Sequence, residues 1–215
     1  MNKIGVVFGI AASGKDTLLE GLVERYPFNY KRIVNDTTRR PRPNEVNDEN
    51  YHFITDEEFE KRKQDSRYIT HNFLHGRGYG VLYSELVSPQ MPIGHFGETD
   101  INQLLEKRDL DIRCIGLIPP SYEEWQERIK QRLLAGLITA DEQEVRTSRI
   151  GSEIKFMLHL QSLQLLRIII SDSSCIQNSH EYLTVTTPEA YEAIDDDAYY
   201  ATTGFMDAIR DINEI

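Results

Sequence analysis

A glycine-rich stretch near the start of the sequence combines residue types that could bind a polyphosphate. Residues 9–17 read Gly-Ile-Ala-Ala-Ser-Gly-Lys-Asp-Thr. Such a loop turns several backbone N–H groups toward one point, and the lysine adds a positive charge beside them. The pattern predicts a phosphate-binding loop whose contact residues are Gly9, Ala11, Ala12, Ser13, Gly14, Lys15, Asp16 and Thr17.

Asp16 occupies the position where this kind of loop usually has a Ser or Thr that ligates Mg²⁺. A carboxylate also ligates Mg²⁺, directly or through water, although it adds negative charge close to the phosphates. Thr17, the next residue, still offers a hydroxyl group. We therefore expect Asp16 and Thr17 to hold the metal ion.

A second cluster of charged residues follows at 36–43, where the sequence reads Asp-Thr-Thr-Arg-Arg-Pro-Arg-Pro. Its prolines favour an extended chain, so Arg39 and Arg42 project as fixed forks. Planar guanidinium groups suit bidentate contacts with a phosphate monoester. Such a run on its own is more often a solvated loop than a binding site. Because it follows a phosphate loop and precedes Asn-Tyr-His-Phe at 50–53, a binding role is favoured here.

Local patterns predict the elements that would position these motifs. Residues 3–8 are an apolar run typical of a buried strand, and residues 16–25 carry Leu and Val at helical spacing. Further strands are expected at 30–34 and 113–118, and Ser/Thr-x-x-Glu signatures predict helices that begin after Thr55, Ser121 and Thr139. This alternation predicts an α/β fold with a mostly parallel central sheet flanked by helices.

The length of 215 residues suits one α/β domain with insertions. We expect a core at 1–34 and 85–194, interrupted by a small subdomain at 35–84 that is rich in Arg, Asn, Tyr and Gly. A helix is expected at 152–166, and either 166–170 or 181–186 would supply the last core strand. Another helix is expected to start at 187–189, before an acidic C-terminal extension at 195–215.

Charge and composition argue against several classes of function. The sequence has 24 Lys and Arg against 35 Asp and Glu, a net charge of −11, which disfavours a broad nucleic-acid or acidic-membrane surface. Cys114 and Cys175 have no metal-site spacing and favour a reducing compartment. No apolar run approaches the length of a membrane span, and the first residues enter a strand without a signal-like segment. We expect a soluble, cytoplasmic protein.

Several motifs occur in the order known from guanylate kinases, and the chain resembles that family over most of residues 3–150. The shared motifs are the phosphate loop, Thr-Thr-Arg-Arg-Pro-Arg-Pro at 37–43, Glu-Val-Asn at 45–47, Tyr-His-Phe at 51–53, Thr-Asp-Glu-Glu-Phe at 55–59, Gly-Tyr-Gly at 78–80 and Ile-Pro-Pro-Ser at 118–121. The resemblance implies a P-loop kinase fold in one guanylate-kinase-like domain, with acceptor binding at 35–84 and a lid near 133–148.

The resemblance also assigns roles to individual residues. It implies that Lys15, Arg132 and Arg149 act on the transferring phosphoryl group, the two arginines from either side of the lid. It implies ATP and Mg²⁺ as cofactors, a small-molecule phosphate acceptor as partner, and a monomer or homodimer. Arg128 is expected to lie at the surface of its helix. The implied acceptor-binding residues are Asn35, Arg39, Arg42, Tyr51, Thr70 and Tyr79.

Departures from the family pattern fall where the acceptor base would be recognised. Thr70 stands where the family has a Glu that hydrogen-bonds guanine, Val81 replaces a hydroxyl residue, and Asn35 replaces a serine. An acidic Asp-x-Asp segment is missing, which leaves Glu98 and Asp100 as substitutes. A pocket that loses hydrogen-bonding partners also loses discrimination between bases, so the departures put strict guanine selectivity in doubt.

Three hypotheses follow. The first is an ATP-dependent nucleoside monophosphate kinase with GMP or dGMP as the first acceptors to test. The second keeps the chemistry and changes the acceptor to a sugar bisphosphate or a modified deoxynucleotide, because of Asp16, Thr70 and Val81. Gly-Lys-Asp at 14–16 and Tyr-Gly-Val at 79–81 are similar to ribose 1,5-bisphosphate phosphokinase, and Gly-Lys-Asp-Thr at 14–17 is similar to some viral deoxynucleoside monophosphate kinases. The third is a non-catalytic guanylate-kinase-like binding module. Such a module is expected to have lost key residues of the phosphate loop, whereas Lys15 is retained here, which disfavours this hypothesis.

Overall fold

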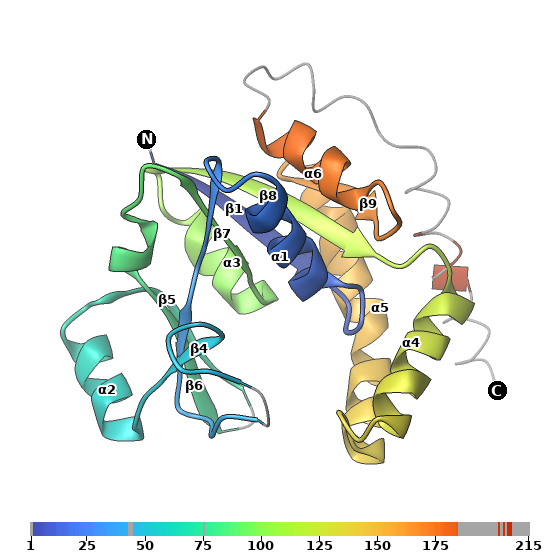
Figure 1. Ribbon diagram of the computed structural model, residues 1–215, viewed down its shortest axis with the longest axis horizontal. Coiled ribbons are helices and arrows are strands. Elements are labelled where there is room, and N and C mark those ends of the chain that lie inside the picture. The colour runs from blue at the N-terminus through green and yellow to red at the C-terminus, as the bar shows by residue number, and fades with distance from the viewer. Residues whose placement is uncertain are drawn as a thin grey trace. The chain divides into compact units, whose positions relative to one another are not determined.

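The computed structural model describes residues 2–42, 45–74 and 76–184, together with residues 202, 204, 206 and 207. The chain divides into two compact units, Met1–Val6 with Val23–Ile112 and Val7–Leu22 with Arg113–Ile215. Both units contain strands as well as helices (Figure 1). This mixed composition confirms the predicted α/β class.

The larger sheet has five strands among the described residues, in the order β2-β7-β1-β8-β9. Strand β2 runs parallel to β7, and β8 runs parallel to β9. The strands predicted at 3–8, 30–34 and 113–118 all form, which confirms the parallel central sheet. The five strands are β1 (Asn2–Gly9), β2 (Tyr30–Arg32), β7 (Met91–His95), β8 (Leu110–Ile118) and β9 (Leu166–Ile170).

Helix α5 (Ala140–Ser162) joins two helical segments that the sequence predicts separately. It begins after Thr139, as predicted, with a complete capping box at Thr139 and Glu142, and it continues without a break into the helix expected at 152–166. The helix therefore takes in part of the range 133–148 that the family resemblance assigns to a lid. It ends before Gln164, whose φ of 57° breaks the helical path. The side of α5 that carries Ile150, Ile154, Met157 and Leu160 is buried.

Residues 166–170 form β9, which decides between the two candidates for the last core strand. Residues 181–184 belong instead to α6 (Cys175–Thr184), where Ser179, Tyr182 and Leu183 are buried at helical spacing. Both α5 and α6 contact β9. Residues 185 and 186, the helix start expected at 187–189 and nearly all of the acidic extension lie outside the described residues.

A second sheet is formed by the segment from Asn35 to Leu82. Among the described residues it has four strands in the order β4-β3-β6-β5, where β3 is parallel to β4 and antiparallel to β6. Helices α2 (Asp56–Gln64) and α3 (Glu98–Leu105) both contact β5. The strands are β3 (Asn35–Thr37), β4 (Tyr51–Phe53), β5 (Tyr68–Leu74) and β6 (Arg77–Leu82), and the short 3-10 helix η1 (Tyr83–Leu86) follows.

The predicted starts of α2, α4 (Tyr122–Leu134) and α5 are confirmed, although not all by a full capping box. Thr55 Oγ1 accepts from the Glu58 N–H at 3.1 Å, and Ser121 Oγ accepts from the Glu124 N–H at 3.2 Å. Glu58 and Glu124 do not complete the box, because their carboxylates pair with Arg62 and Arg128 one turn along the helix.

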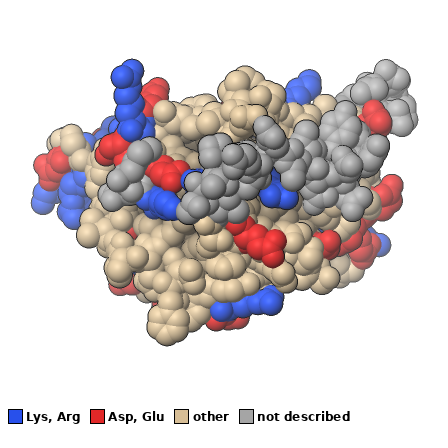
Figure 2. All heavy atoms as spheres, turned by 90° about the horizontal axis from the view of Figure 1, so that it is seen from above, with Lys and Arg blue, Asp and Glu red and all other residues tan. Residues whose placement is uncertain are grey.

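Acidic and basic side chains are mixed on the face that Figure 2 shows, so that the coloured Lys and Arg atoms there lie close to Asp and Glu. An anionic ligand on such a surface would have to be met by local arginines. Within the described part of the chain, every helix is too short or too polar to cross a membrane.

Candidate functional site

The glycine-rich loop joins β1 to α1 (Lys15–Arg25), as the sequence predicts. Gly14 has a φ of 94° and Ala12 a φ of 61°, so the loop curls through two left-handed residues. A side chain at Gly9 would collide with the Leu117 carbonyl oxygen of β8, which explains why this position needs glycine. The loop therefore has the tight, close-packed path that a phosphate cradle requires.

The Lys15 side chain folds back onto the loop and contacts its backbone. Its Nζ donates to the carbonyl oxygens of Gly9 at 2.8 Å and Ile10 at 2.9 Å. Burial of the ammonium group lowers the pKa of Lys15 to about 8, an effect that Glu153 and Asp16 oppose. The ammonium group is thus held at the loop. It loses its proton at a lower pH than a solvated lysine does.

Helix α4 fastens the loop through two side chains on one helical face. Trp125 is buried, and its Nε1–H donates to the Ala11 carbonyl at 2.8 Å. Arg128 Nη1 donates to Ser171 Oγ at 2.8 Å and lies 3.5 Å from two carbonyl oxygens of the loop. Arg128 is therefore more than a surface residue of its helix, although its side chain remains 28% exposed. Its position three residues after Trp125 was the signal, since residues at that spacing share a face.

Ser13 and the first turn of α1 supply the groups that fit a nucleotide and its metal. The Ser13 side chain is fully buried, and its hydroxyl has no hydrogen-bond partner among the described residues. A phosphate oxygen would satisfy this donor. Asp16 and Thr17 are exposed at the start of α1, and their oxygens are the ligand type that Mg²⁺ takes together with substrate phosphates. The residues present therefore fit ATP with Mg²⁺.

The arginines assigned to the lid are placed differently from one another. Arg132, in the last turn of α4, contributes to the lowered pKa of Lys15, and so does Arg146 of α5. Arg149 is exposed on α5. Sequence reasoning missed Arg146, although it precedes the buried Ile150 by one turn and therefore belongs to the inward part of the helix.

Strand register gathers most of the acceptor-binding candidates onto one face of the second sheet, which we call the acceptor face. Asn35 pairs with Tyr51, and Thr37 pairs with Tyr79. Thr70 pairs with Val81, two residues beyond Tyr79. Because paired residues share a face and side chains alternate along a strand, the acceptor face carries these side chains together. The rings of Tyr51 and Tyr79 lie 6.3 Å apart.

Arg39 is held in a fixed orientation by Glu45. Arg39 Nη1 and Nη2 donate to the two carboxylate oxygens at 2.6 and 2.7 Å, and this pairing lowers the pKa of Glu45. The guanidinium also lies over the Tyr51 ring, 4.9 Å from its centroid. Glu45 accepts in addition from the Arg42 N–H, whereas the Arg42 side chain is exposed. Glu45 was not among the predicted site residues, although its place in the Glu-Val-Asn motif at 45–47 was a signal.

Of the two acidic residues considered as substitutes in the base pocket, Asp100 lies beside Thr70 and Glu98 is exposed. Asp100 Oδ2 accepts from Asn72 Nδ2 at 2.7 Å and from the Gly97 N–H at 3.2 Å. Burial raises the pKa of Asp100, while Gly97, Thr70 and Asn72 oppose the rise. A carboxylate therefore does stand next to Thr70, but it comes from α3.

Gln103, one turn after Asp100, fixes α3 to β5. Its side-chain amide accepts from the His71 N–H at 3.0 Å and donates to the His71 carbonyl at 2.9 Å. This two-point contact is made with the backbone of the residue between Thr70 and Asn72. It therefore fixes the position of Asp100 along β5, next to Thr70 and Asn72.

Comparisons with known proteins agree with these features. A family model described as guanylate kinase matches residues 1–157. A guanylate kinase of Baumannia cicadellinicola subsp. Homalodisca coagulata is 30% identical over 177 residues, which span 78% of this chain and 81% of that protein. One of Idiomarina loihiensis is 30% identical over 173 residues, 77% of this chain and 79% of that protein. The crystal structure of guanylate kinase from Anaplasma phagocytophilum has the same fold, with a TM-score of 0.56 and 19% identity over 84% of this chain and 81% of that one.

Proposed function

This chain belongs to the guanylate kinase family, and we propose on that premise that it transfers the γ-phosphoryl group of ATP to a nucleoside or deoxynucleoside monophosphate, with GMP and dGMP as the first acceptors. The family makes it a phosphotransferase. The observation that carries the proposal is the intact loop at 9–17, in which Lys15 bridges Gly9 and Ile10 and a buried Ser13 hydroxyl is left to a ligand.

The donor side of the reaction is assigned to the loop. Backbone groups of residues 9–17 would cradle the β-phosphate, and Lys15 would follow the β and γ oxygens. Mg²⁺, held by Asp16 and Thr17, would neutralise phosphate charge when it is bound with ATP. Arg132 and Arg149 were assigned to the γ-phosphoryl group. We add Arg146, because it shares the surroundings of Lys15 with Arg132.

The acceptor side is assigned to the acceptor face. Arg39 and Arg42, with Tyr51 and Tyr79, would hold the acceptor phosphate. One of its oxygens would attack the γ-phosphorus, and the bond to the bridging oxygen would break, so that ADP leaves with the electron pair. That oxygen is already anionic, and so no general base is needed; alignment and exclusion of water supply the rate.

A second acceptor class is favoured by one observation. Thr70 is fully buried, Val81 is apolar and buried, and the carboxylate beside them comes from Asp100. In the guanylate kinase pattern, by contrast, residue 70 is itself a Glu that hydrogen-bonds the guanine base. Ribose 1,5-bisphosphate and modified deoxynucleotides are therefore kept as alternative acceptors.

A panel of acceptors tests the function. GMP, dGMP, the other nucleoside monophosphates and ribose 1,5-bisphosphate are each incubated with ATP and Mg²⁺, and the release of ADP is measured. Turnover of GMP or dGMP supports the first acceptor class, and turnover of another compound alone supports the second. If calorimetry detects no ATP binding and no acceptor reacts, the chain is a binding module and the proposal fails.

Replacing Asp100 with asparagine is expected to weaken use of the acceptor. A hydrogen bond to a charged group contributes about 1.5–3 kcal/mol, so kcat/KM for the best nucleotide should fall by about tenfold to 100-fold while KM for ATP stays unchanged. Glu98→Gln is the matched control, because it removes an exposed carboxylate from the same helical turn. Equal losses in both variants, or none in Asp100→Asn, would contradict a role for Asp100 in acceptor choice.

A further inference from the structure

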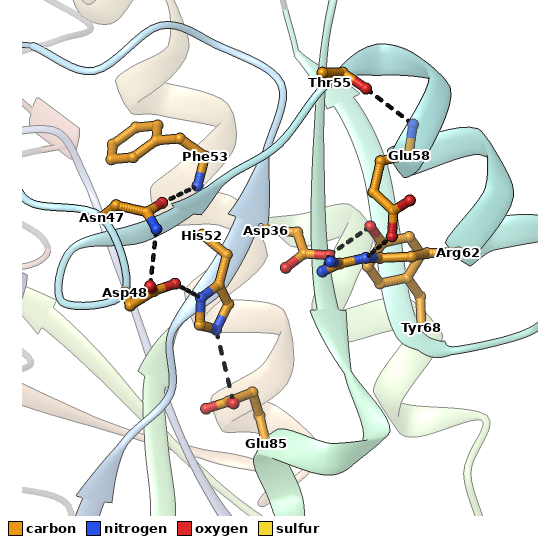
Figure 3. A network of polar contacts seen from close by, with 10 residues as sticks. All are labelled: Asp36, Asn47, Asp48, His52, Phe53, Thr55, Glu58, Arg62, Tyr68 and Glu85. Atoms are coloured by element: carbon orange, nitrogen blue, oxygen red, sulfur yellow. Dashed lines mark hydrogen bonds and ion pairs between the residues drawn. The ribbon is translucent and has the colours of Figure 1, made fainter.

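Behind the acceptor face, three elements meet at one buried carboxylate, as Figure 3 shows. Asp36 of β3 is fully buried. Its Oδ2 accepts from Arg62 Nη1 of α2 at 2.7 Å and from the Tyr68 hydroxyl of β5 at 2.6 Å. Arg62 Nε also donates to Glu58 at 2.8 Å. We call Asp36, Arg62 and Tyr68 the rear cluster.

The rear cluster lies on the side of the sheet opposite the acceptor face. Asp36 alternates with Asn35 and Thr37, and it pairs with His52 and Gly80. A side chain at Gly80 would run into the Tyr68 ring, which occupies that side of the sheet. Asp36 is therefore fixed from behind the acceptor face, next to Asn35.

Stability alone does not explain the rear cluster. Asp36 Oδ1 is buried and has no hydrogen-bond partner among the described residues, and such an oxygen has lost its hydration. Burial would lower the pKa of Arg62, but its hydrogen bonds to Glu58 and Asp36 raise it above the ordinary value. Apolar side chains of similar volume are often as stable as a buried ion pair or more so, and in some proteins a buried polar group is retained because it specifies one geometry.

The geometry that the cluster fixes is that of the segment leading to Arg39. Asp36 is followed by Thr37 and Thr38, and Thr38 is tied to Gly78 of β6 by its N–H at 3.1 Å and its hydroxyl at 3.0 Å. The Arg39 N–H then donates to Thr37 Oγ1 at 3.3 Å. If Asp36 moves, these hydrogen bonds therefore transmit the displacement along the backbone to Arg39.

We propose that the rear cluster is a positioning device for the acceptor site, which sets β3 so that Asn35 and Arg39 meet the acceptor. The inference rests on the proposed function of the acceptor face. It assigns Asp36, Arg62 and Tyr68 no contact with the substrate. They act through β3.

Asp36→Asn tests the proposal, because it keeps the shape and removes the charge that holds Arg62. Misplacement of a binding group by about 1 Å can cost up to 100-fold, so KM for the acceptor should rise by about tenfold to 100-fold. KM for ATP and kcat should stay within about twofold. Lys61→Gln is the matched control: it removes an exposed charge next to Arg62 in α2 and should change nothing. Equal changes in kcat and in both KM values would indicate a merely structural role and overturn the proposal.

A second variant separates positioning from folding. The triple replacement Asp36→Leu, Arg62→Met and Tyr68→Phe is expected to unfold in urea at the wild-type concentration or above, and yet to show the raised acceptor KM. A wild-type acceptor KM in a stably folded triple variant would overturn the proposal.

Hydrogen exchange provides a readout that needs no acceptor. The amides of Thr38 and Arg39 should exchange at least about tenfold faster in Asp36→Asn than in Lys61→Gln. Unchanged exchange would overturn the positioning role whatever the acceptor panel gives. If Asp36→Asn exchanges faster but the wild type phosphorylates no acceptor, the positioning role of the rear cluster is supported and the proposed function fails. The failure of the proposed function can therefore be told apart from the failure of the positioning role.

Discussion

Lys15→Ala is expected to reduce phosphoryl transfer by about 10³-fold or more, because in the proposed mechanism the lysine supplies the positive charge that follows the transferring group. Its Nζ already lies within the loop, 2.8 Å from the Gly9 carbonyl oxygen and 2.9 Å from that of Ile10. Alanine leaves the backbone of the loop free to keep its path while the charge is lost. The measurement is the initial rate of ADP formation with the acceptor that the panel identifies.

The control for this variant removes a lysine that lies elsewhere. Lys130→Ala deletes an ammonium group of α4 whose side chain is 67% exposed and pairs at the surface with Glu127. Fluorescence of Trp125, the single tryptophan of the chain, reports whether the loop is intact, since its indole contacts Ala11. Undiminished turnover in Lys15→Ala with an unchanged Trp125 signal would refute the assignment of the loop as the ATP site.

The same lysine should give the enzyme a pH dependence. Burial lowers the pKa of Lys15 to about 8, so its charge is present below that pH and is lost above it. We expect kcat/KM for ATP to fall as the pH rises from about 7 to 9.5, and we expect Lys15→Arg to lack this fall. The sign for stability is opposite: the charged form opposes folding below pH 8, and this cost fades as the pH rises toward the unfolded value of 10.5. A flat profile in the wild type would contradict the assignment.

Trp125→Ala is expected to cause the largest loss of stability, about 3–5 kcal/mol in the free energy of unfolding, since it empties the space of a side chain that is 2% exposed. It also frees the Ala11 carbonyl, and the loop should hold ATP more weakly. Urea denaturation gives the stability, and calorimetry gives the affinity for ATP.

Trp125→Phe separates the two contributions of this side chain. It keeps most of the buried ring and removes only the donor to Ala11, so the loss of stability should be about 1–2 kcal/mol. ATP affinity should nevertheless fall in both variants. If Trp125→Phe binds ATP as tightly as the wild type, the hydrogen bond does not hold the loop in its working shape.

Much of the proposed ATP site could be predicted because its signals are local. The strand, loop and helix around residues 9–17 follow from an apolar run, two glycines and helical spacing, all within a few turns of chain. The caps at Thr55, Ser121 and Thr139 are equally local. The extent of α5 was not predicted, since a helix continues until something ends it, and Gln164 is not a typical stop.

Contacts between distant segments escaped prediction for a different reason. Arg128 and Arg146 carry only weak signals in the sequence, namely their helical spacing from Trp125 and Ile150, and Asp100 is named there without a partner. The groups that they affect lie far away along the chain: Arg128 donates to Ser171, Asp100 accepts from Asn72, and the charge of Arg146 lowers the pKa of Lys15. Only packing between elements brings such groups together.

The sequence by itself determined the class of fold, the glycine-rich loop and the residue types of the proposed acceptor site, because backbone propensity and motif spacing act over short stretches. Tertiary structure alone decided which charges work together. Strand register placed Asn35, Tyr51, Thr70 and Tyr79 on one face of a sheet, and it turned Asp36 to the other. Register depends on which strands pair and which face is covered, and these are properties of the whole folded unit.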